Sequence, residues 1–192
     1  MDLKETLCRY LQRQREAVLW KVEGLSEREV RMPRTATGTN LLGIVKHLTG
    51  VEADYFGACL DRPWPEAVAW DEDAEPNVDM WATATESPTY IVDRYRRATA
   101  WADETIAGLP LEAPARVPWW QPQETTLGRL LVHMVAETGR HAGHLDILRE
   151  EADGARGMLP AVDNLPERDA DWWRGYVARL RAVAEGSDTA PP

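Results

Sequence analysis

The stretch 126-TLGRLLVHMVAETGRHAGHLDILREEADG-154 decides how the chain folds. Its apolar residues recur at three-to-four spacing, which is typical of one long amphipathic helix. Thr125 or Thr126 can cap the start of this helix, and Gly154 is the residue type that commonly follows a helix end. Within the helix, one carboxylate and two imidazoles fall inside eight positions, residues 137–144, of a chain that has only four histidines.

The same periodicity extends outward to the rest of the chain. It predicts further helices over about 3–23, 40–60, 88–109 and 169–185. Turn-forming and proline-rich segments separate them, and no run shows the alternation of a strand. Four or five long helices joined by loops of mixed length therefore indicate an all-α bundle.

Helix-start signals support these boundaries. Ser26 and Glu29 have the spacing of a capping box for a short turn after the first helix. Ser87 and Pro88 are an N-cap residue followed by a first helical residue that has no amide proton to satisfy. Several helix starts are thus specified locally.

Length and charge limit the class of protein. The 192 residues suit one domain, expected over residues 1–185 with a disordered tail at 186–192. The 32 acidic against 22 basic residues give a net charge of −10, which opposes binding to nucleic acid or an anionic membrane surface. Without an apolar run of signal-peptide or membrane-span length, a cytoplasmic protein is expected.

The polar positions of the long helix form a candidate site. At 100° per residue, Glu137, His141 and His144 lie at roughly 0°, 40° and 340°, within one narrow stripe, and His133 extends the stripe without necessarily sharing the site. Buried polar groups need partners, so hydrogen bonds, ion pairs or a metal are expected there. The competing interpretation is a solvated helical face that pairs with neighbouring arginines.

A metal uses these groups most completely. His47 lies among apolar residues of the predicted helix over 40–60, and together with Glu137 and His141 it makes a three-ligand set that leaves one position open for catalysis. The donors suit zinc, while nickel, iron and manganese are alternatives. His144 is an alternative third ligand or a nearby proton acceptor, and spacing alone leaves both open.

Tryptophans supply candidate pocket walls. Trp119 and Trp120 directly precede the long helix, and Trp64, Trp70 and Trp81 lie in the connection after the predicted helix over 40–60. Such rings could stack on a sugar or on an apolar electrophile, and ordinary packing is the alternative.

Two blocks, "GTNLLGIVKHLTGVEADYFG" (38–57) and "LVHMVAETGRHAGHLDILREEADG" (131–154), resemble the DinB-like superfamily, in particular its mycothiol-dependent S-transferases and maleylpyruvate isomerases. The resemblance implies a four-helix bundle with a long crossover, here with an additional C-terminal helix. It also implies a divalent metal, commonly zinc, held by His47, Glu137 and His141. Glu137 stands where many members have histidine, a departure shared by the isomerases, and His144 stands where many have glutamine.

The implied function is a metal-dependent transferase that activates a low-molecular-weight thiol, mycothiol, as a thiolate for attack on a small electrophile. A free thiol with a pKa of about 8.5 is only a few per cent ionised at neutral pH, and a metal removes this limit. His144 would take up the thiol proton. The alternatives are a metal-dependent hydrolase or isomerase and a non-catalytic metal-binding stress-response protein. A homodimer is also expected, from the apolar helical faces.

Overall fold

The computed structural model of the chain describes residues 2–66, 75–160, 162–163 and 165–187. The chain forms two compact units, Met1–Val162 and Asp163–Pro192, and each is described by itself. The single domain expected over residues 1–185 stays a prediction. Of the tail expected at 186–192, Gly186 and Ser187 end the last helix, and 188–192 lie outside the described residues.

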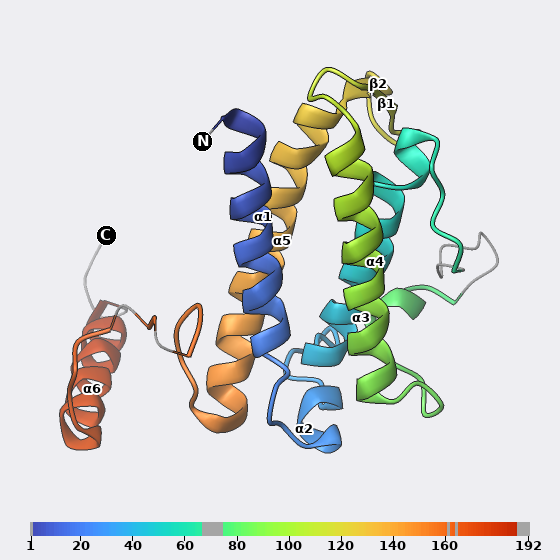
Figure 1. Cartoon of the computed structure of the whole chain (residues 1–192). Helices are drawn as coiled ribbons and strands as arrows, with labels where there is room; N and C mark the ends of the chain where they lie inside the picture. The colour runs from blue at the N-terminus through green and yellow to red at the C-terminus, as the bar shows by residue number, and fades with distance from the viewer. Residues whose placement is uncertain (1, 67–74, 161, 164, 188–192) are drawn as a thin grey trace. The chain divides into compact units, whose positions relative to one another are not determined.

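The first unit is a four-helix bundle, so the predicted all-α fold is confirmed (Figure 1). Within it, α1 and α5 run in one direction and α3 and α4 run in the other (Figure 1). Because α3 and α4 are parallel, the chain between them must return along the length of the bundle, which is the expected long crossover. The four bundle helices are α1 (Leu3–Trp20), α3 (Leu41–Tyr55), α4 (Pro88–Gly108) and α5 (Leu127–Asp153), and the short α2 (Glu27–Arg31) lies in the connection between α1 and α3.

Local capping fixes the helix starts as predicted. Ser26 forms a capping box with Glu29 at the start of α2. Ser87 accepts a hydrogen bond from the backbone of Tyr90, so that α4 begins at Pro88. These caps satisfy amide protons that have no partner inside the helix.

The long helix α5 has the predicted caps. Of the two predicted threonines, Thr126 is the N-cap, and it accepts a hydrogen bond from the backbone of Arg129. At the other end Gly154 adopts a left-handed conformation with φ of +81°, which glycine reaches without steric cost.

The sequence prediction differs from the structure at two helix ends and in two short strands. The helix predicted over 3–23 ends at Trp20. The helix predicted over 40–60 ends at Tyr55 and continues as a single 3₁₀ turn, η1 (Ala58–Leu60). The chain departs from the α-helix at Gly57, where a Cβ atom would overlap with the carbonyl oxygen of Ala53.

Two strands were not expected. β1 (Pro114–Arg116) and β2 (Glu124–Thr126) pair antiparallel between α4 and α5. With three residues each, they are too short to show an alternating pattern, and backbone hydrogen bonds define them.

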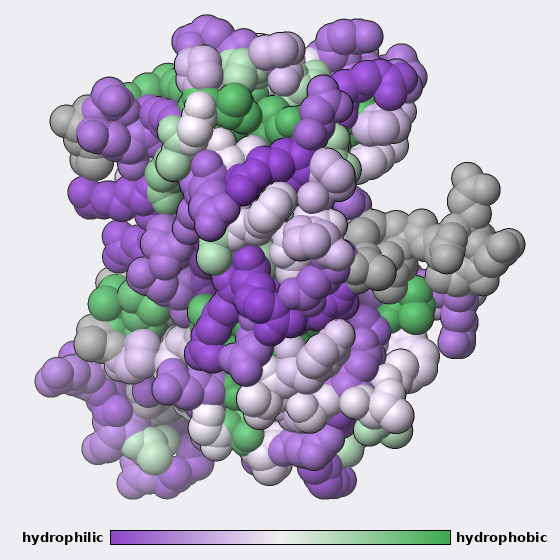
Figure 2. All heavy atoms as spheres, turned by 45° about the vertical axis from the view of Figure 1, so that its right-hand side comes forward, coloured by the Kyte–Doolittle hydropathy of each residue, from purple (hydrophilic) through white to green (hydrophobic). Residues whose placement is uncertain are grey.

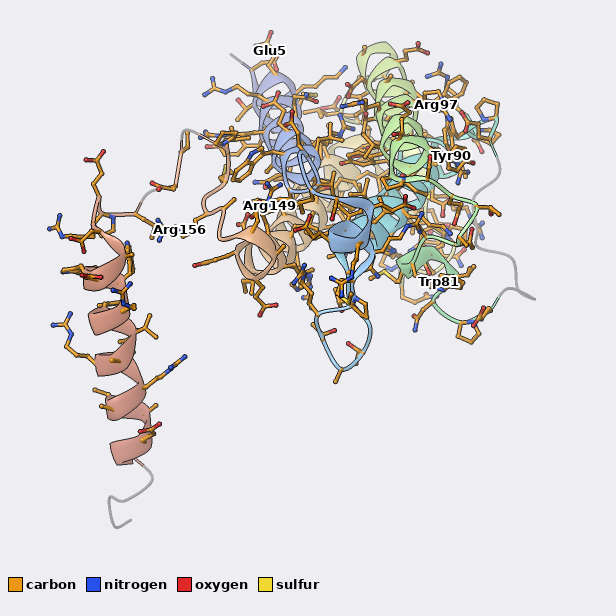
Figure 3. All side chains as sticks on the ribbon, turned by 90° about the horizontal axis from the view of Figure 1, so that it is seen from below. Glu5, Trp81, Tyr90, Arg97, Arg149 and Arg156 are labelled. Atoms are coloured by element: carbon orange, nitrogen blue, oxygen red, sulfur yellow. The ribbon has the colours of Figure 1, made fainter. Side chains whose placement is uncertain are left out.

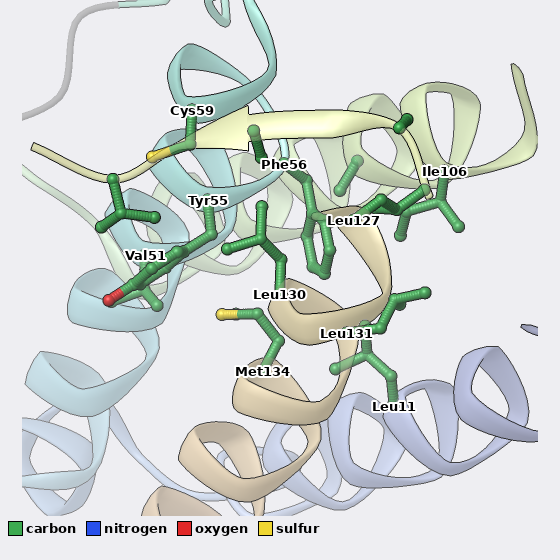
Figure 4. Close-up of a cluster of buried hydrophobic side chains, with 14 residues drawn as sticks. Leu11, Val51, Tyr55, Phe56, Cys59, Ile106, Leu127, Leu130, Leu131 and Met134 are labelled. Carbon is green, nitrogen blue, oxygen red and sulfur yellow. The ribbon is translucent and has the colours of Figure 1, made fainter. Parts of the chain in front are cut away.

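Two buried apolar clusters fill the bundle at different heights. One surrounds Phe56 and Leu130 near the start of α5 (Figure 4). The other surrounds Ile44 and Leu145 near the end of α5. Between these two stretches of α5 lie the polar positions of residues 137–141, so the candidate site sits where the apolar core is interrupted.

One face of the outer surface is mainly hydrophilic (Figure 2), as expected for a chain in which 28 % of the residues are charged. Figure 2 shows a face on which hydrophilic side chains predominate and hydrophobic ones form small separate areas. Seen from below, Arg149 lies at the end of the bundle (Figure 3), where it donates hydrogen bonds to backbone carbonyls that follow α1, including that of Lys21.

None of the helices in the described ranges combines the length and hydropathy that a membrane span needs.

Among its described residues, the second unit contains one helix, α6 (Ala170–Ser187), which matches the predicted helix over 169–185. Trp172 stacks on Tyr176 with ring centroids 5.2 Å apart, and Trp173 contacts both rings edge-on.

Candidate functional site

The three predicted ligands come together between α3 and α5. One donor atom from each of His47, Glu137 and His141 lies within 4.8 Å of the other two. The helices pack against each other, and the four-residue spacing places Glu137 and His141 one turn apart on α5. Nε2 of His141 lies 3.1 Å from Oε1 of Glu137, and the two imidazole centroids are 4.9 Å apart.

This donor set fits a divalent metal. Two imidazoles and one carboxylate are a common ligand set for zinc in catalytic sites, with further positions left for solvent or substrate. Burial and the neighbouring His47 lower the pKa of His141, while Glu137 opposes this shift. His141 is therefore neutral at pH 7, which is the form that can coordinate a metal.

His47 is hydrogen-bonded to a carboxylate that the sequence analysis did not identify as part of the site. Oδ2 of Asp79 lies 2.7 Å from Nδ1 of His47 and accepts its hydrogen bond. The two side chains are only 17 % and 18 % exposed. Asp79 belongs to the 3₁₀ turn η2 (Val78–Met80), in the crossover between α3 and α4.

A pocket of about 560 Å³ opens beside the three candidate ligands. Its wall on α3 follows the helical spacing of residues 47, 51 and 54, and its other side comes from α5 and from the connection before it. The lining residues are His47, Val51, Asp54, Tyr55, Trp119, His133 and Glu137.

Asp54 is an unusual group in this wall. The half-buried carboxylate has no hydrogen-bond or ion-pair partner among the described residues. Burial raises the pKa of Asp54 to about 6. A partly buried acid without a partner in a pocket is a candidate for contact with a ligand.

Aromatic rings form the far end of the pocket. The Tyr55 ring lies 4.7 Å from His133 and 5.5 Å from Trp119, centroid to centroid, and Nε1 of Trp119 donates to its hydroxyl group over 3.1 Å. Trp119 is 57 % exposed and lines the pocket, whereas Trp120 packs behind Tyr55 and His133 against the core.

The two remaining histidines of α5 differ in position. His133 lines the pocket, and burial lowers its pKa. His144 is exposed, with its ring 5.5 Å from that of His141, and it is not part of the three-donor group found among the described residues. Its predicted role as proton acceptor stays a prediction.

The other predicted wall tryptophans lie elsewhere or outside the described part of the chain. Trp64 packs under Arg94, with the guanidinium 5.2 Å from the ring centroid. Trp81 lines a separate hollow beside Met80. Trp70 lies outside the described residues.

Sequence reasoning missed Asp79 and Asp54 for different reasons. Asp54 follows His47 by seven residues, so helical spacing already placed the two on one face. Asp79 lies in an irregular connection, where spacing gives no indication of which side chains meet.

The fold and the three-donor group define a class, the DinB-like helical bundle proteins. Among solved structures, a conserved protein from Enterococcus faecalis is similar, with a TM-score of 0.55 and 16 % identity. The alignment covers 80 % of this chain and 99 % of that one, and at this identity it supports the fold alone. No curated protein matches the chain.

The family follows from the sequence itself. The profile described as mycothiol-S-transferase matches residues 6–154, which include all three candidate ligands. The chain belongs to the mycothiol S-transferase family.

Proposed function

We propose that the protein is a metal-dependent transferase that conjugates mycothiol, or a similar low-molecular-weight thiol, to a small electrophile. The observation that carries the proposal is the convergence of His47, Glu137 and His141 beside a pocket of about 560 Å³, which His47 and Glu137 line. Family membership supports the thiol. The open pocket favours a catalytic site over the closed site that a purely structural metal would need.

His47, Glu137 and His141 would hold the metal, and zinc is the first choice for this donor set, with nickel, iron or manganese as alternatives. A divalent cation bound there would lower the pKa of a thiol and so supply thiolate at neutral pH. Glu137 is preferred to His144 as the third ligand because its carboxylate lies 3.1 Å from His141.

The pocket wall would hold the rest of the thiol and the electrophile. The Trp119 and Tyr55 rings offer flat apolar surfaces for a sugar or an apolar group. The Asp54 carboxylate can accept hydrogen bonds from hydroxyl groups of the same ligand. His133, neutral and facing the pocket, is a second candidate beside His144 to accept the thiol proton.

Elemental analysis of the purified protein tests the metal. We expect about one equivalent of a divalent metal in the wild type. His47→Ala, Glu137→Ala and His141→Ala should lose it, and His144→Ala should retain it. Retention by Glu137→Ala and loss by His144→Ala would instead assign the third ligand to His144. A folded wild-type protein that stays metal-free after zinc is offered would overturn the proposal.

The loaded protein is then assayed for conjugation of mycothiol to a fluorogenic alkylating agent. Turnover that needs both metal and thiol supports the transferase. Metal-dependent turnover of small esters or isomerisable acids without thiol would favour the hydrolase or isomerase. A bound metal without any turnover would favour the non-catalytic protein. The cytoplasmic location and the homodimer stay predictions, the latter tested by light scattering.

A further inference from the structure

Of the two candidate histidine ligands, His47 receives a carboxylate from the described part of the crossover between α3 and α4, and His141 does not. Asp79 accepts a hydrogen bond from Nδ1 of His47 over 2.7 Å. The corresponding Nδ1 atom of His141 is buried without a hydrogen-bond partner among the described residues. The two imidazoles are therefore held in different ways.

The segment that carries Asp79, residues 77–86, is fastened to α3 just before His47. The carbonyl oxygen of Met80 lies against Gly43, where a Cβ atom would overlap with it. The same carbonyl accepts a hydrogen bond from Nδ2 of Asn40 over 3.3 Å, and Oδ1 of Asn40 caps the backbone of Gly43 over 2.7 Å. The residue after Asp79 is thus in direct contact with the first turn of α3.

A second attachment follows one turn later. Lys46 donates from Nζ to the carbonyl oxygen of Trp81 over 3.0 Å and pairs with Glu86 over 2.8 Å. Figure 3 shows Trp81 on the side of the bundle where α3 lies. Lys46 is buried and directly precedes His47 in the sequence, so the same turn of helix that presents the imidazole also holds the segment that supports it.

We propose that Asp79 is the positioning residue of His47: its carboxylate keeps the proton on Nδ1 and the ring in one orientation, so that Nε2 is the atom offered to a metal. Carboxylates that bind the far nitrogen of a metal-bound histidine fix its tautomer and raise its basicity. This inference rests on the proposed function, because it assigns His47 to a metal. It adds Asp79 to the site. Through Asp79 and the contact of the Met80 carbonyl with Gly43, the metal site would depend on the crossover.

Zinc affinity is the first measurement, made by competition with a chromophoric chelator. Asp79→Ala should weaken zinc binding by about 10- to 100-fold. Asp79→Asn keeps an acceptor without the charge and should fall between Asp79→Ala and the wild type. Asp93→Ala, which removes an exposed carboxylate on α4, is the matched control and should bind zinc as the wild type does.

The tautomer of His47 is the second measurement, and a merely structural role would not change it. In the metal-free protein, the ring-nitrogen chemical shifts of His47 should indicate a protonated Nδ1 atom. In Asp79→Ala they should move toward the other tautomer or an average, with the thermal unfolding midpoint showing that the variant is folded. Equal zinc affinity and an unchanged tautomer in Asp79→Ala would overturn the inference and leave the proposed function intact.

Failure of the proposed function gives a different result. A wild-type protein without zinc affinity overturns the metal site and with it the role of Asp79 toward a metal. Gly43→Ala tests the backbone contact. It should displace Met80 and weaken zinc binding, although Gly43 offers no side chain to the three-donor group. Gly143→Ala, also in a helix but with no atom within 4 Å of the added methyl group, should bind zinc normally.

Discussion

The two faces of α3 carry carboxylates in opposite situations. Glu52 is fully buried and binds Arg15 through both oxygens, each over 2.7 Å, while Asp103 pairs with the same guanidinium from α4. Asp54 lies two residues further on and faces the pocket without such a partner among the described residues. On the core face Arg15 neutralises the charge of Glu52, whereas on the pocket face none of the described side chains pairs with Asp54.

The pKa values follow this division. Burial lowers the pKa of Arg15. The carboxylates of Glu52 and Asp103 raise this pKa by more than burial lowers it, so the guanidinium stays charged. Burial alone raises the pKa of Asp54. An acid in a pocket whose pKa burial raises, without a charged partner among the described residues, is a candidate for contact with a ligand.

The largest expected effect comes from removing the charge of Glu52 in the buried ion pair with Arg15. Glu52→Gln leaves a buried guanidinium facing a neutral amide and should lower the free energy of unfolding by about 3 kcal/mol. Urea denaturation measures this. The double variant Arg15→Met, Glu52→Leu removes both charges and should be more stable than Glu52→Gln, and a double variant that is equally unstable would show that the ion pair is not the cause.

The next effect concerns the pocket side. Replacing His133 by alanine should lower the conjugation rate by about a hundredfold if this pocket-facing imidazole accepts the thiol proton, whereas His144→Ala should change it by less than about threefold. Metal content, measured on both variants, should stay at the wild-type level. The reverse order of the two rates would assign proton transfer to His144, as the sequence predicts.

A smaller effect concerns Asp54 and pH. Its folded-state pKa of about 6 exceeds the ordinary value of 3.8, so the folded protein binds this proton more tightly than the unfolded chain. The stabilising contribution of this bound proton is therefore fully present below about pH 4, and it is lost as the pH rises through about 6. In the metal-free protein Asp54→Asn should be more stable than the wild type by about 1 kcal/mol at pH 7.5, after allowance for solvent in the pocket.

At pH 4 the gain from Asp54→Asn should disappear, because the wild-type carboxyl group is then protonated as well. Thermal unfolding at both pH values makes the comparison, with Asp93→Asn as the exposed control. A gain that does not depend on pH would mean that the charge of Asp54 costs no stability.

The smallest effect lies beside the buried ion pair. The Tyr95 hydroxyl group is buried and has no hydrogen-bond partner among the described residues, although it lies in the field of Glu52. Tyr95→Phe should change the free energy of unfolding by no more than about 0.5 kcal/mol. A loss above 1 kcal/mol would show that the hydroxyl group belongs to the ion-pair network.

Regular spacing accounts for what the sequence predicted correctly. The caps of α5 and the four-residue spacing of Glu137 and His141 depend only on helix geometry, so both could be predicted without a structure. The same geometry extended from His47 to Asp54 would have indicated the pocket wall on α3. Helical residues could thus be placed to within a turn.

Contacts made by irregular segments could not be predicted in this way. The position of Asp79 depends on the Met80 carbonyl resting on Gly43, a contact between residues 37 apart whose register no periodic pattern encodes. The two strands between α4 and α5 are defined by backbone pairing of three residues each. The sequence predicted both Trp119 and Trp120 as pocket walls. Only the path of the connection before α5 decides that Trp119 lines the pocket and Trp120 packs against the core.

The long crossover gives this bundle an opportunity for protein engineering. The two helices that the crossover joins, α3 and α4, span roughly 20 to 30 Å at 1.5 Å per residue, whereas a fully extended chain as long as residues 56–87 reaches about 100 Å. The connection therefore has more chain than the crossing requires. Libraries that vary its length and composition outside residues 77–86 would show whether the crossover controls access to the pocket, while the candidate ligands on α3 and α5 keep their positions.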